Sequence, residues 1–155
     1  MGEHPIDAFN VPFESWIDTI TFCFTMDLVA WYHLRAMENS SFAPWAREMT
    51  TMVHEEKFHA SFGARRVADV MRSAEYARLC GADRDEVQRS VNKWYPAALD
   101  MFGRSDSPNV PKFIHWGLKS VGNAEIRRTY KAYVDGKLQG LGLEVPDEKS
   151  NRRFL

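Results

Sequence analysis

The sequence predicts an all-α protein built as one helical bundle. Apolar residues recur with the helical period in almost every segment, and no stretch alternates convincingly enough between apolar and polar residues to be a strand. The 155 residues are the length of one ordinary domain. We therefore expect a single domain over residues 1–155, with an irregular C-terminal tail over residues 141–155.

The first two expected helices are the longest. Helix 13–38 is apolar almost all round between Trp16 and Trp31, as expected of a helix that is buried on several sides. A connector, Ser-Ser-Phe-Ala, leads to the second helix, 44–72. Pro44 can occupy its first turn, where the N–H group that proline lacks is not needed. Two such helices cannot cover their apolar faces unaided, which indicates a partner.

Shorter helices are expected in the second half of the chain. A short helix over 73–81 ends at Gly81, and Asp83 is placed to cap the next helix, 84–103. Pro96 lies inside this helix and should kink it, because proline removes one backbone hydrogen bond.

The last expected helices follow the clearest loop of the sequence. This loop covers residues 104–111 and leads to a short helix over 112–121. A longer helix, 124–142, comes next, with Asn123 as its N-cap.

Charge and hydropathy limit the classes of partner. Twenty basic and 21 acidic residues give a formal net charge of −1, and no long block carries one sign. We therefore expect no nucleic acid and no anionic membrane surface as partner. The most apolar stretch, residues 16–31, contains Asp and Thr residues and falls short of the roughly 20 apolar residues that span a bilayer.

Cysteine usage and the N-terminal residues suggest a compartment. Cys23 and Cys80 form no Cys-x-x-Cys pair and no disulfide framework, which fits a reducing environment. The first ten residues lack the basic and apolar segments of a signal peptide. We expect a cytoplasmic protein.

The first candidate for chemistry is Asp27, which lies in the middle of the apolar stripe of helix 13–38. An unpaired buried carboxylate costs several kcal/mol, so it needs a cation or strong hydrogen-bond donors. An arginine or a helix cap within the core could serve as well as a metal. Asp18 is half a turn out of phase with Asp27, and we expect it to be solvated.

The second candidate is a Glu-x-x-His pair in helix 44–72. Glu56 and His59 are the only polar members of one helical face, which also contains Met49, Met52, Val53, Ala60 and Gly63. A carboxylate and an imidazole at positions i and i+3 are the element that carboxylate-bridged di-iron bundles use, and this donor set suits iron or manganese. We expect neither cysteine near this face, which argues against a thiolate zinc site. His33 is expected on the surface or in a polar network.

Several motifs, taken in order, resemble one family. They are Asp27, "SFAPWAREM", "HEEKFH", "SVNKWYPAALDMFG", "WGLKSVGNAEIRR" and "LGLEVPD". Together they resemble the catalytic subunits of phenylacetyl-CoA epoxidases, with benzoyl-CoA epoxidases as more distant relatives. The resemblance covers nearly the whole chain, but only the C-terminal half of the family's ferritin-like core. It implies a ferritin-like bundle of which this chain supplies about half of the four-helix core, together with C-terminal helices.

The resemblance also implies an activity and roles for residues. In that family a di-iron centre activates dioxygen and epoxidises the aromatic ring of a CoA thioester. Asp27 would be the lone carboxylate ligand, Glu56 the bridging carboxylate and His59 the terminal imidazole, so these residues are the expected metal-binding and catalytic residues. Iron is the expected metal, with manganese possible. Lys119 and Asn123 match positions that lie near the CoA moiety, although Lys119 could equally be an ordinary exposed lysine.

The family's other ligands, a first Glu and a first Glu-x-x-His, have no counterpart in this sequence. We expect a second chain to carry them, so the protein would be one subunit of a di-iron monooxygenase that acts on an aromatic acyl-CoA with electrons from a reductase. A homodimer would supply the same ligands from two copies. Two alternatives remain: a non-catalytic ferritin-like scaffold subunit, and a homodimeric iron-binding or ferroxidase protein.

Overall fold

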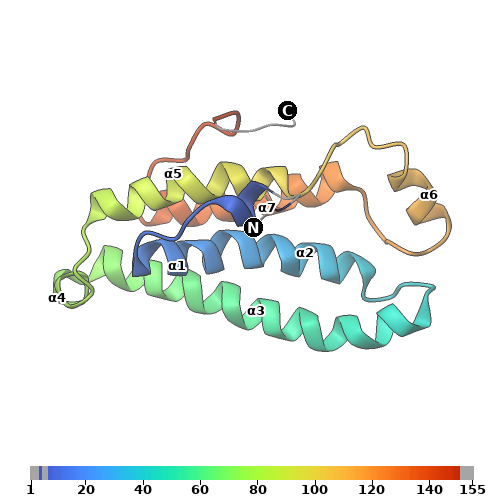
Figure 1. Cartoon of the computed structure of the whole chain (residues 1–155), viewed down its shortest axis with the longest axis horizontal. Helices are drawn as coiled ribbons and strands as arrows, with labels where there is room; N and C mark the ends of the chain where they lie inside the picture. Colours follow the sequence, from blue (N-terminus) through green and yellow to red (C-terminus); the bar gives the residue numbers. More distant parts are fainter. Residues whose placement is uncertain (1–3, 5–6, 151–155) are drawn as a thin grey trace.

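The computed structural model of the chain is an elongated bundle of helices (Figure 1), and it describes residue 4 and residues 7–150. No strand occurs within these residues, so the predicted all-α helical bundle is confirmed. The elements are a 3₁₀-helix η1 (Asp7–Asn10), α1 (Trp16–Phe22), a π-helical turn η2 (Cys23–Asp27), α2 (Leu28–Met37), α3 (Ala43–Arg72), α4 (Ala74–Leu79), α5 (Arg84–Asp100), α6 (Val110–His115) and α7 (Asn123–Gly140).

The first long helix is continuous from α1 through η2 to α2, but it contains a π turn that the sequence did not predict. It begins at Trp16 and not at residue 13, because Ser15 is extended and its side chain accepts a hydrogen bond from the backbone N–H of Asp18. Ser15 is therefore the N-cap. The wider turn η2 ends at Asp27, so the candidate carboxylate sits where the helix changes its pitch.

The helix α3 runs antiparallel to α1 and α2 along their whole length (Figure 1). Pro44 lies in its first turn as predicted. The two helices approach most closely at Gly63: a Cβ atom added there would lie 2.5 Å from the Ile20 carbonyl oxygen and 2.8 Å from Cys23 Cβ. The absence of a side chain at Gly63 is what allows the two backbones to meet at the π turn.

Two predicted helix ends in the second half are confirmed. Gly81 and Gly103 have φ angles of +62° and +70°, which favour glycine over other residues. The Asp83 side chain accepts a hydrogen bond from the backbone N–H of Glu86 and so caps α5 as predicted. The helix α5 continues through Pro96 to Asp100.

Other predictions for this half are wrong. The helix expected over 112–121 covers only Val110–His115, and Lys119 lies in the loop that follows it. This loop is held against the end of α2, because the backbone N–H and the hydroxyl of Ser120 both donate to the Ala36 carbonyl (2.8 and 3.0 Å). The predicted N-cap Asn123 is instead the first residue of α7, and Gly122 occupies the cap position.

The core lies where α1, η2 and α2 meet α3, α5 and α7. Its largest buried side chains are Trp94, Tyr95, Tyr130, Phe24 and Phe102. In the part of the chain that the structure describes, no helix combines the length and the hydropathy that a membrane span would need. Residues 141–150 add no further helix, and the last five residues of the expected 141–155 tail lie outside the described residues.

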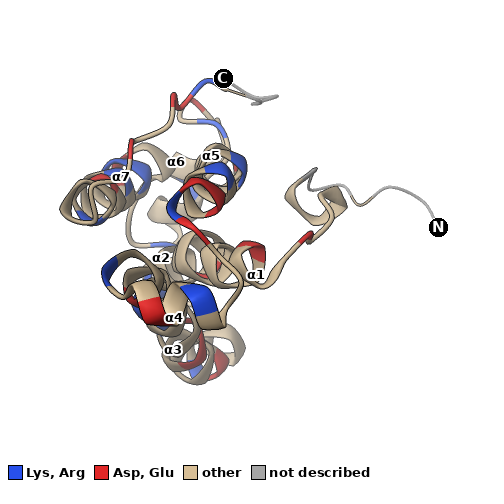
Figure 2. Cartoon of the chain, turned by 90° about the vertical axis from the view of Figure 1, so that its left-hand side faces the viewer, with Lys and Arg blue, Asp and Glu red and all other residues tan. Residues whose placement is uncertain are grey.

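The structure corrects the prediction that Asp18 would be solvated. Seen along the bundle, α1 lies between α3 and α5 (Figure 2), so the side of α1 away from α3 is also covered. Asp18 is buried and accepts hydrogen bonds from Lys93 Nζ (2.6 Å), Ser90 Oγ (2.7 Å) and Trp94 Nε1 (3.2 Å). Burial alone would raise the pKa of Asp18, but the hydrogen bonds from Lys93 and Ser90 outweigh it and leave the pKa below its ordinary value.

We expect Asp18→Asn to lower the free energy of unfolding at pH 7 by about 2 kcal/mol, because it removes the buried carboxylate from Lys93 and leaves only the exposed Glu14 paired with that ammonium. The pKa of Asp18 is lowered in the folded state, so its stabilisation is present above the unfolded-state pKa near 4 and is lost as the pH falls through the folded pKa. Urea unfolding at pH 7 and at pH 2.5 measures both effects, and the variant should differ from wild type mainly at pH 7. Asp106→Asn, at an exposed ion pair with Arg104, is the control and should change little. Equal losses in both variants would contradict a special role for Asp18.

Candidate metal centre

The structure brings Asp27, Glu56 and His59 together. Each offers one donor atom, and these atoms all lie within 4.8 Å of one another. Asp27 is the last residue of η2, and the other two residues lie one turn apart on α3, which packs beside it. Two carboxylates and one imidazole in this arrangement form the only such group of three or more ligating side chains within the described residues.

Neither carboxylate of the group forms an ion pair with a lysine or an arginine within the described residues. The Oε2 atom of Glu56 is buried and accepts no hydrogen bond within the described part of the chain, and His59 Nδ1 lies 4.0 Å from it. Burial raises the pKa of Asp27 and that of Glu56, and in the case of Glu56 the negative charge of Asp27 raises it further. Both carboxylates are therefore held in surroundings that disfavour their charged forms.

A divalent cation fits this donor set. A cation between the two carboxylates would relieve their repulsion and give the buried oxygen of Glu56 a partner. Oxygen and imidazole nitrogen donors suit iron or manganese. The His59 side chain is 51% exposed, compared with 24% for Glu56, so one side of the group is open. Three donors do not complete the coordination of a metal ion, and the open side leaves room for further ligands.

The face of α3 that carries the group is less covered than the sequence predicted. Met49, Val53, Ala60 and Gly63 are buried as expected, but Met52 is 41% exposed. Farther toward the start of α3, Trp45 is 48% exposed. This face is thus only partly covered by the rest of the described chain, as expected of a surface that packs against another unit.

The position of Cys23 shows that the prediction of no cysteine near the Glu-x-x-His face was wrong. Cys23 is the first residue of the π turn that ends at Asp27, and its Cβ atom lies against Gly63 of α3. Burial, followed by the charge of Asp27, raises the pKa of Cys23 to about 12. The thiol therefore keeps its proton at neutral pH. The i, i+4 spacing of Cys23 and Asp27 was the signal in the sequence that could have shown that the two residues lie on the same side of the helix.

The two predicted substrate residues are bonded to each other at the other end of α2. Lys119 Nζ donates to Asn123 Oδ1 (2.7 Å), and Asn123 Nδ2 donates to the Arg104 carbonyl (3.2 Å). Burial lowers the pKa of Lys119, and no carboxylate in the described ranges forms an ion pair with it. Both residues line a mainly apolar pocket of about 310 Å³, together with Met37, Trp45, Ser107, Asn109, Val110, Phe113 and Leu118.

His33 lies inside the fold and not on the surface. Its ring packs 5.1 Å from that of Phe102, and its Nε2 atom is buried with no partner among the described residues. Burial, with the positive charge of Lys119 as a second cause, lowers the pKa of His33 to about 4. It is therefore a neutral, partly buried histidine at pH 7.

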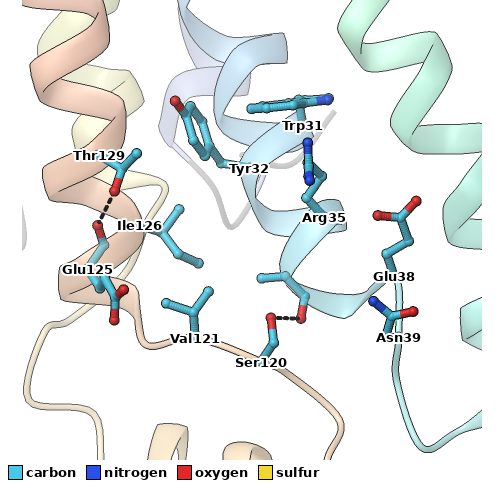
Figure 3. A pocket seen from close by; sticks show the side chains of 11 residues that line it. Trp31, Tyr32, Arg35, Glu38, Asn39, Ser120, Val121, Glu125, Ile126 and Thr129 are labelled. Carbon is cyan, nitrogen blue, oxygen red and sulfur yellow. Dashed lines mark hydrogen bonds between the residues drawn. The ribbon is translucent and has the colours of Figure 1, made fainter.

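A second pocket lies between α2 and α7 (Figure 3) and has a volume of about 470 Å³. Trp31 and Tyr32 line one side, one turn beyond Asp27, and Arg35 stacks on the Trp31 ring at 5.2 Å. Glu38 and Glu125 also line it. Because the pocket carries charges of both signs, its lining shows no preference for an anion.

Two comparisons with known proteins bear on this site. The family described as "Phenylacetic acid catabolic protein" matches residues 4–153 of the chain. The chain is also 30% identical, over 141 residues, to one of the subunits of 1,2-phenylacetyl-CoA epoxidase from Escherichia coli (strain K12). That match covers 90% of this chain and 44% of the relative, so the chain spans less than half the length of that protein.

Proposed function

Because this chain belongs to the phenylacetic acid catabolic protein family, we propose that it is one component of a di-iron monooxygenase that acts on an aromatic acyl-CoA. The observation that carries the proposal is the group of Asp27, Glu56 and His59, whose donor atoms lie within 4.8 Å of one another. A scaffold subunit would have no need to hold two carboxylates in surroundings that raise their pKa values. The similarity to an epoxidase subunit supports the reaction class.

The residues of this chain bind and orient the centre. Asp27 and Glu56 would each offer carboxylate oxygens, and His59 would offer one ring nitrogen. Bound iron, with manganese as the alternative, would supply the activation of dioxygen that no protein side chain provides. Phe24, three residues before Asp27, and Ala60, next to His59, are both buried, so the group has apolar neighbours. The tight contact at Gly63 holds η2 against α3 and fixes the distance between Asp27 and the Glu-x-x-His pair.

Lys119 and Asn123 fit the recognition of the CoA part of the substrate. Lys119 is a half-buried ammonium with an amide as its partner and no ion-paired carboxylate among the described residues, and such a group attracts an anion such as a phosphate. The apolar lining of the adjoining 310 Å³ pocket suits the uncharged arm of a thioester. The segment that carries Lys119 is fixed by Ser120 to the end of α2, the helix that follows Asp27.

The open side of the centre requires a partner that supplies the remaining ligands. We propose a second chain with a Glu and a Glu-x-x-His, and a reductase that delivers electrons. The exposed His59 and Met52 mark the face on which that chain would pack. A second copy of this chain would bring the same set of one Asp, one Glu and one His, so the composition of the purified assembly distinguishes the heteromer from the homodimer.

Two substitutions test the proposed roles in the same assembly. His59→Ala should lower the iron or manganese content to half or less of the wild-type value and abolish oxygen-dependent conversion of phenylacetyl-CoA. Lys119→Ala should leave the metal content unchanged and raise the KM for the thioester about tenfold, with weaker salt dependence, since one charge-assisted contact is worth about 1.5–3 kcal/mol. Metal analysis and steady-state turnover of each variant are the measurements.

His54→Ala is the matched control for the first substitution. His54 lies five residues before His59 on an exposed part of α3, where its ring bonds the Thr50 carbonyl at 2.7 Å, and it lies outside the candidate group. Equal metal content in wild type, His54→Ala and His59→Ala would overturn the metal assignment. An unchanged KM in Lys119→Ala would leave the metal assignment standing and remove Lys119 from the substrate site.

A further inference from the structure

Two side chains of α7 hold the loop that follows α5. Asn123 and Arg127 lie four residues apart on α7, and both reach this loop. Arg127 donates from Nη2 to the Gly103 carbonyl and from Nη1 to Ser105 Oγ (2.7 Å). The carbonyl of Arg104, the residue in between, accepts from Asn123 Nδ2 at 3.2 Å. Three consecutive residues of the loop are therefore bonded to one face of α7.

The loop leads directly to the pocket that contains Lys119. Gly103 turns the chain away from the end of α5 with a φ angle of +70°. The next residue, Arg104, bonds both carboxylate oxygens of Asp106 at 2.9 and 2.8 Å, so the loop is also held together internally. Ser107 and Asn109, which follow, line the pocket of about 310 Å³. The position of this wall of the pocket thus depends on the bonds to α7.

The same bonds determine the direction of the Asn123 amide. A side-chain amide has donor hydrogens on its nitrogen and an acceptor oxygen on the other side. Because Nδ2 of Asn123 donates to the loop, Oδ1 faces Lys119 and accepts from its Nζ at 2.7 Å. A chain of contacts therefore runs from Arg127 through the loop and Asn123 to Lys119. Arg127 itself lies outside the lining of the pocket, so it can act there only through these neighbours.

We propose that Arg127 is a positioning residue for the thioester. Its guanidinium holds the loop that forms one wall of the pocket and, through the Arg104 carbonyl and Asn123, directs the ammonium of Lys119. A planar guanidinium donates to two acceptors in a fixed geometry, which the single ammonium of a lysine on its flexible stem does not reproduce. The role in substrate binding rests on the proposed function, whereas the bonds to the loop exist in the chain alone.

Hydrogen exchange tests the bonds to the loop without any substrate. Arg127→Lys keeps the charge but loses the two-pronged contact, so the backbone amides of residues 103–109 should exchange faster than in wild type, while those of α3 should not change. Arg128→Lys, at an exposed neighbour that makes none of these contacts, is the matched control. Unchanged exchange of residues 103–109 in Arg127→Lys would overturn the proposal.

Equilibrium binding of phenylacetyl-CoA tests the role in recognition. It is measured by calorimetry on the purified assembly without a reductant, so that no turnover occurs. Arg127→Lys should weaken binding about tenfold, as the loss of one or two hydrogen bonds predicts, with the metal content of wild type. Since the charge is kept, a lost attraction for phosphate cannot explain such a change. Ser105→Ala, which removes one of the two acceptors, should have a smaller effect in the same direction, and Arg128→Lys should have none.

A double variant separates positioning from support of the fold. If Arg127 acts through Lys119, Arg127→Lys combined with Lys119→Ala should weaken binding by clearly less than the product of the two single losses. Losses that multiply fully would show that Arg127 only supports the fold, which overturns the proposal. Wild-type affinity in both Arg127→Lys and Ser105→Ala would overturn this inference alone. A wild-type assembly that binds no phenylacetyl-CoA would overturn the proposed function as well.

Discussion

Gly63→Ala is expected to lower the free energy of unfolding by at least about 3 kcal/mol, at the upper end of what overpacking a core costs. The new methyl group would press on the backbone N–H of Phe24 and lie 2.5 Å from the Ile20 carbonyl oxygen. These atoms belong to the helix itself and cannot turn aside as the end of a flexible side chain could. The gain of about 1 kcal/mol that alanine brings within a helix is too small to offset the clash.

Gly136→Ala in α7 provides the matched control. Nothing within the described chain lies within 4 Å of a Cβ atom added at Gly136, so only the helix preference should act and the variant should be more stable by about 0.5–1 kcal/mol. Thermal and urea unfolding of both variants measure the difference. A Gly63→Ala protein that is as stable as wild type would show that α1 and α3 can separate freely, and the close contact at the π turn would then not hold Asp27 in place.

Asp27→Asn is expected to have opposite effects without and with metal. Burial raises the pKa of Asp27 in the folded state. A carboxyl group whose folded pKa is raised costs the folded state nothing below its unfolded pKa, but it lowers the free energy of unfolding as the pH rises through the folded pKa. At pH 7 to 8 the charged group is therefore a cost to the metal-free protein. The neutral amide should keep or raise the melting temperature there, and the difference should vanish below about pH 4.

With Fe(II) the order should reverse. Binding to the folded state stabilises wild type by about 2.7 kcal/mol at a metal concentration 100 times the Kd, and an amide is a poor ligand for a hard cation. Asp27→Asn should lose most of that gain. Anaerobic melting curves with and without Fe(II) are the measurement, with Glu55→Gln as the control at an exposed neighbour outside the group. If the amide variant gains as much from Fe(II) as wild type, Asp27 is a structural carboxylate and not a ligand.

The convergence of Asp27 with Glu56 and His59 could be expected from the sequence for a simple reason. Each lies in the apolar stripe of a long helix, and a short connector makes the two helices antiparallel neighbours whose stripes face each other. The same reasoning placed Gly63 on that face. Periodicity placed each residue on an inward face, because both stripes are long and are interrupted by few polar residues, and the family resemblance joined the three into one set.

The predictions that failed depended on neighbours that a helical period does not reveal. The side of α1 that carries Asp18 is covered by α5, a helix more than 60 residues later in the sequence, and the partners Ser90 and Lys93 come from there. The helix expected over 112–121 ends early because residues expected in it bond elsewhere: the Ser120 N–H donates to the Ala36 carbonyl at the end of α2, and the Gly117 carbonyl accepts from the Ser41 N–H. Asn123 uses its side chain to hold Lys119 and the Arg104 carbonyl, so it is not available as a cap.

The π turn makes the number of residues in the first long helix important for the direction in which its side chains point. A π turn holds one residue more than the α turn it replaces, so deleting any residue of Cys23–Asp27 and restoring an α-helix would rotate everything before it by about 100° relative to α2. Asp18 would then swing away from Lys93, or Asp27 away from Glu56. A homologue with one residue fewer in this turn could keep the Asp18–Lys93 ion pair or the inward-facing carboxylate of Asp27, but not both. The length of this helix should therefore be inherited unchanged even where its sequence drifts.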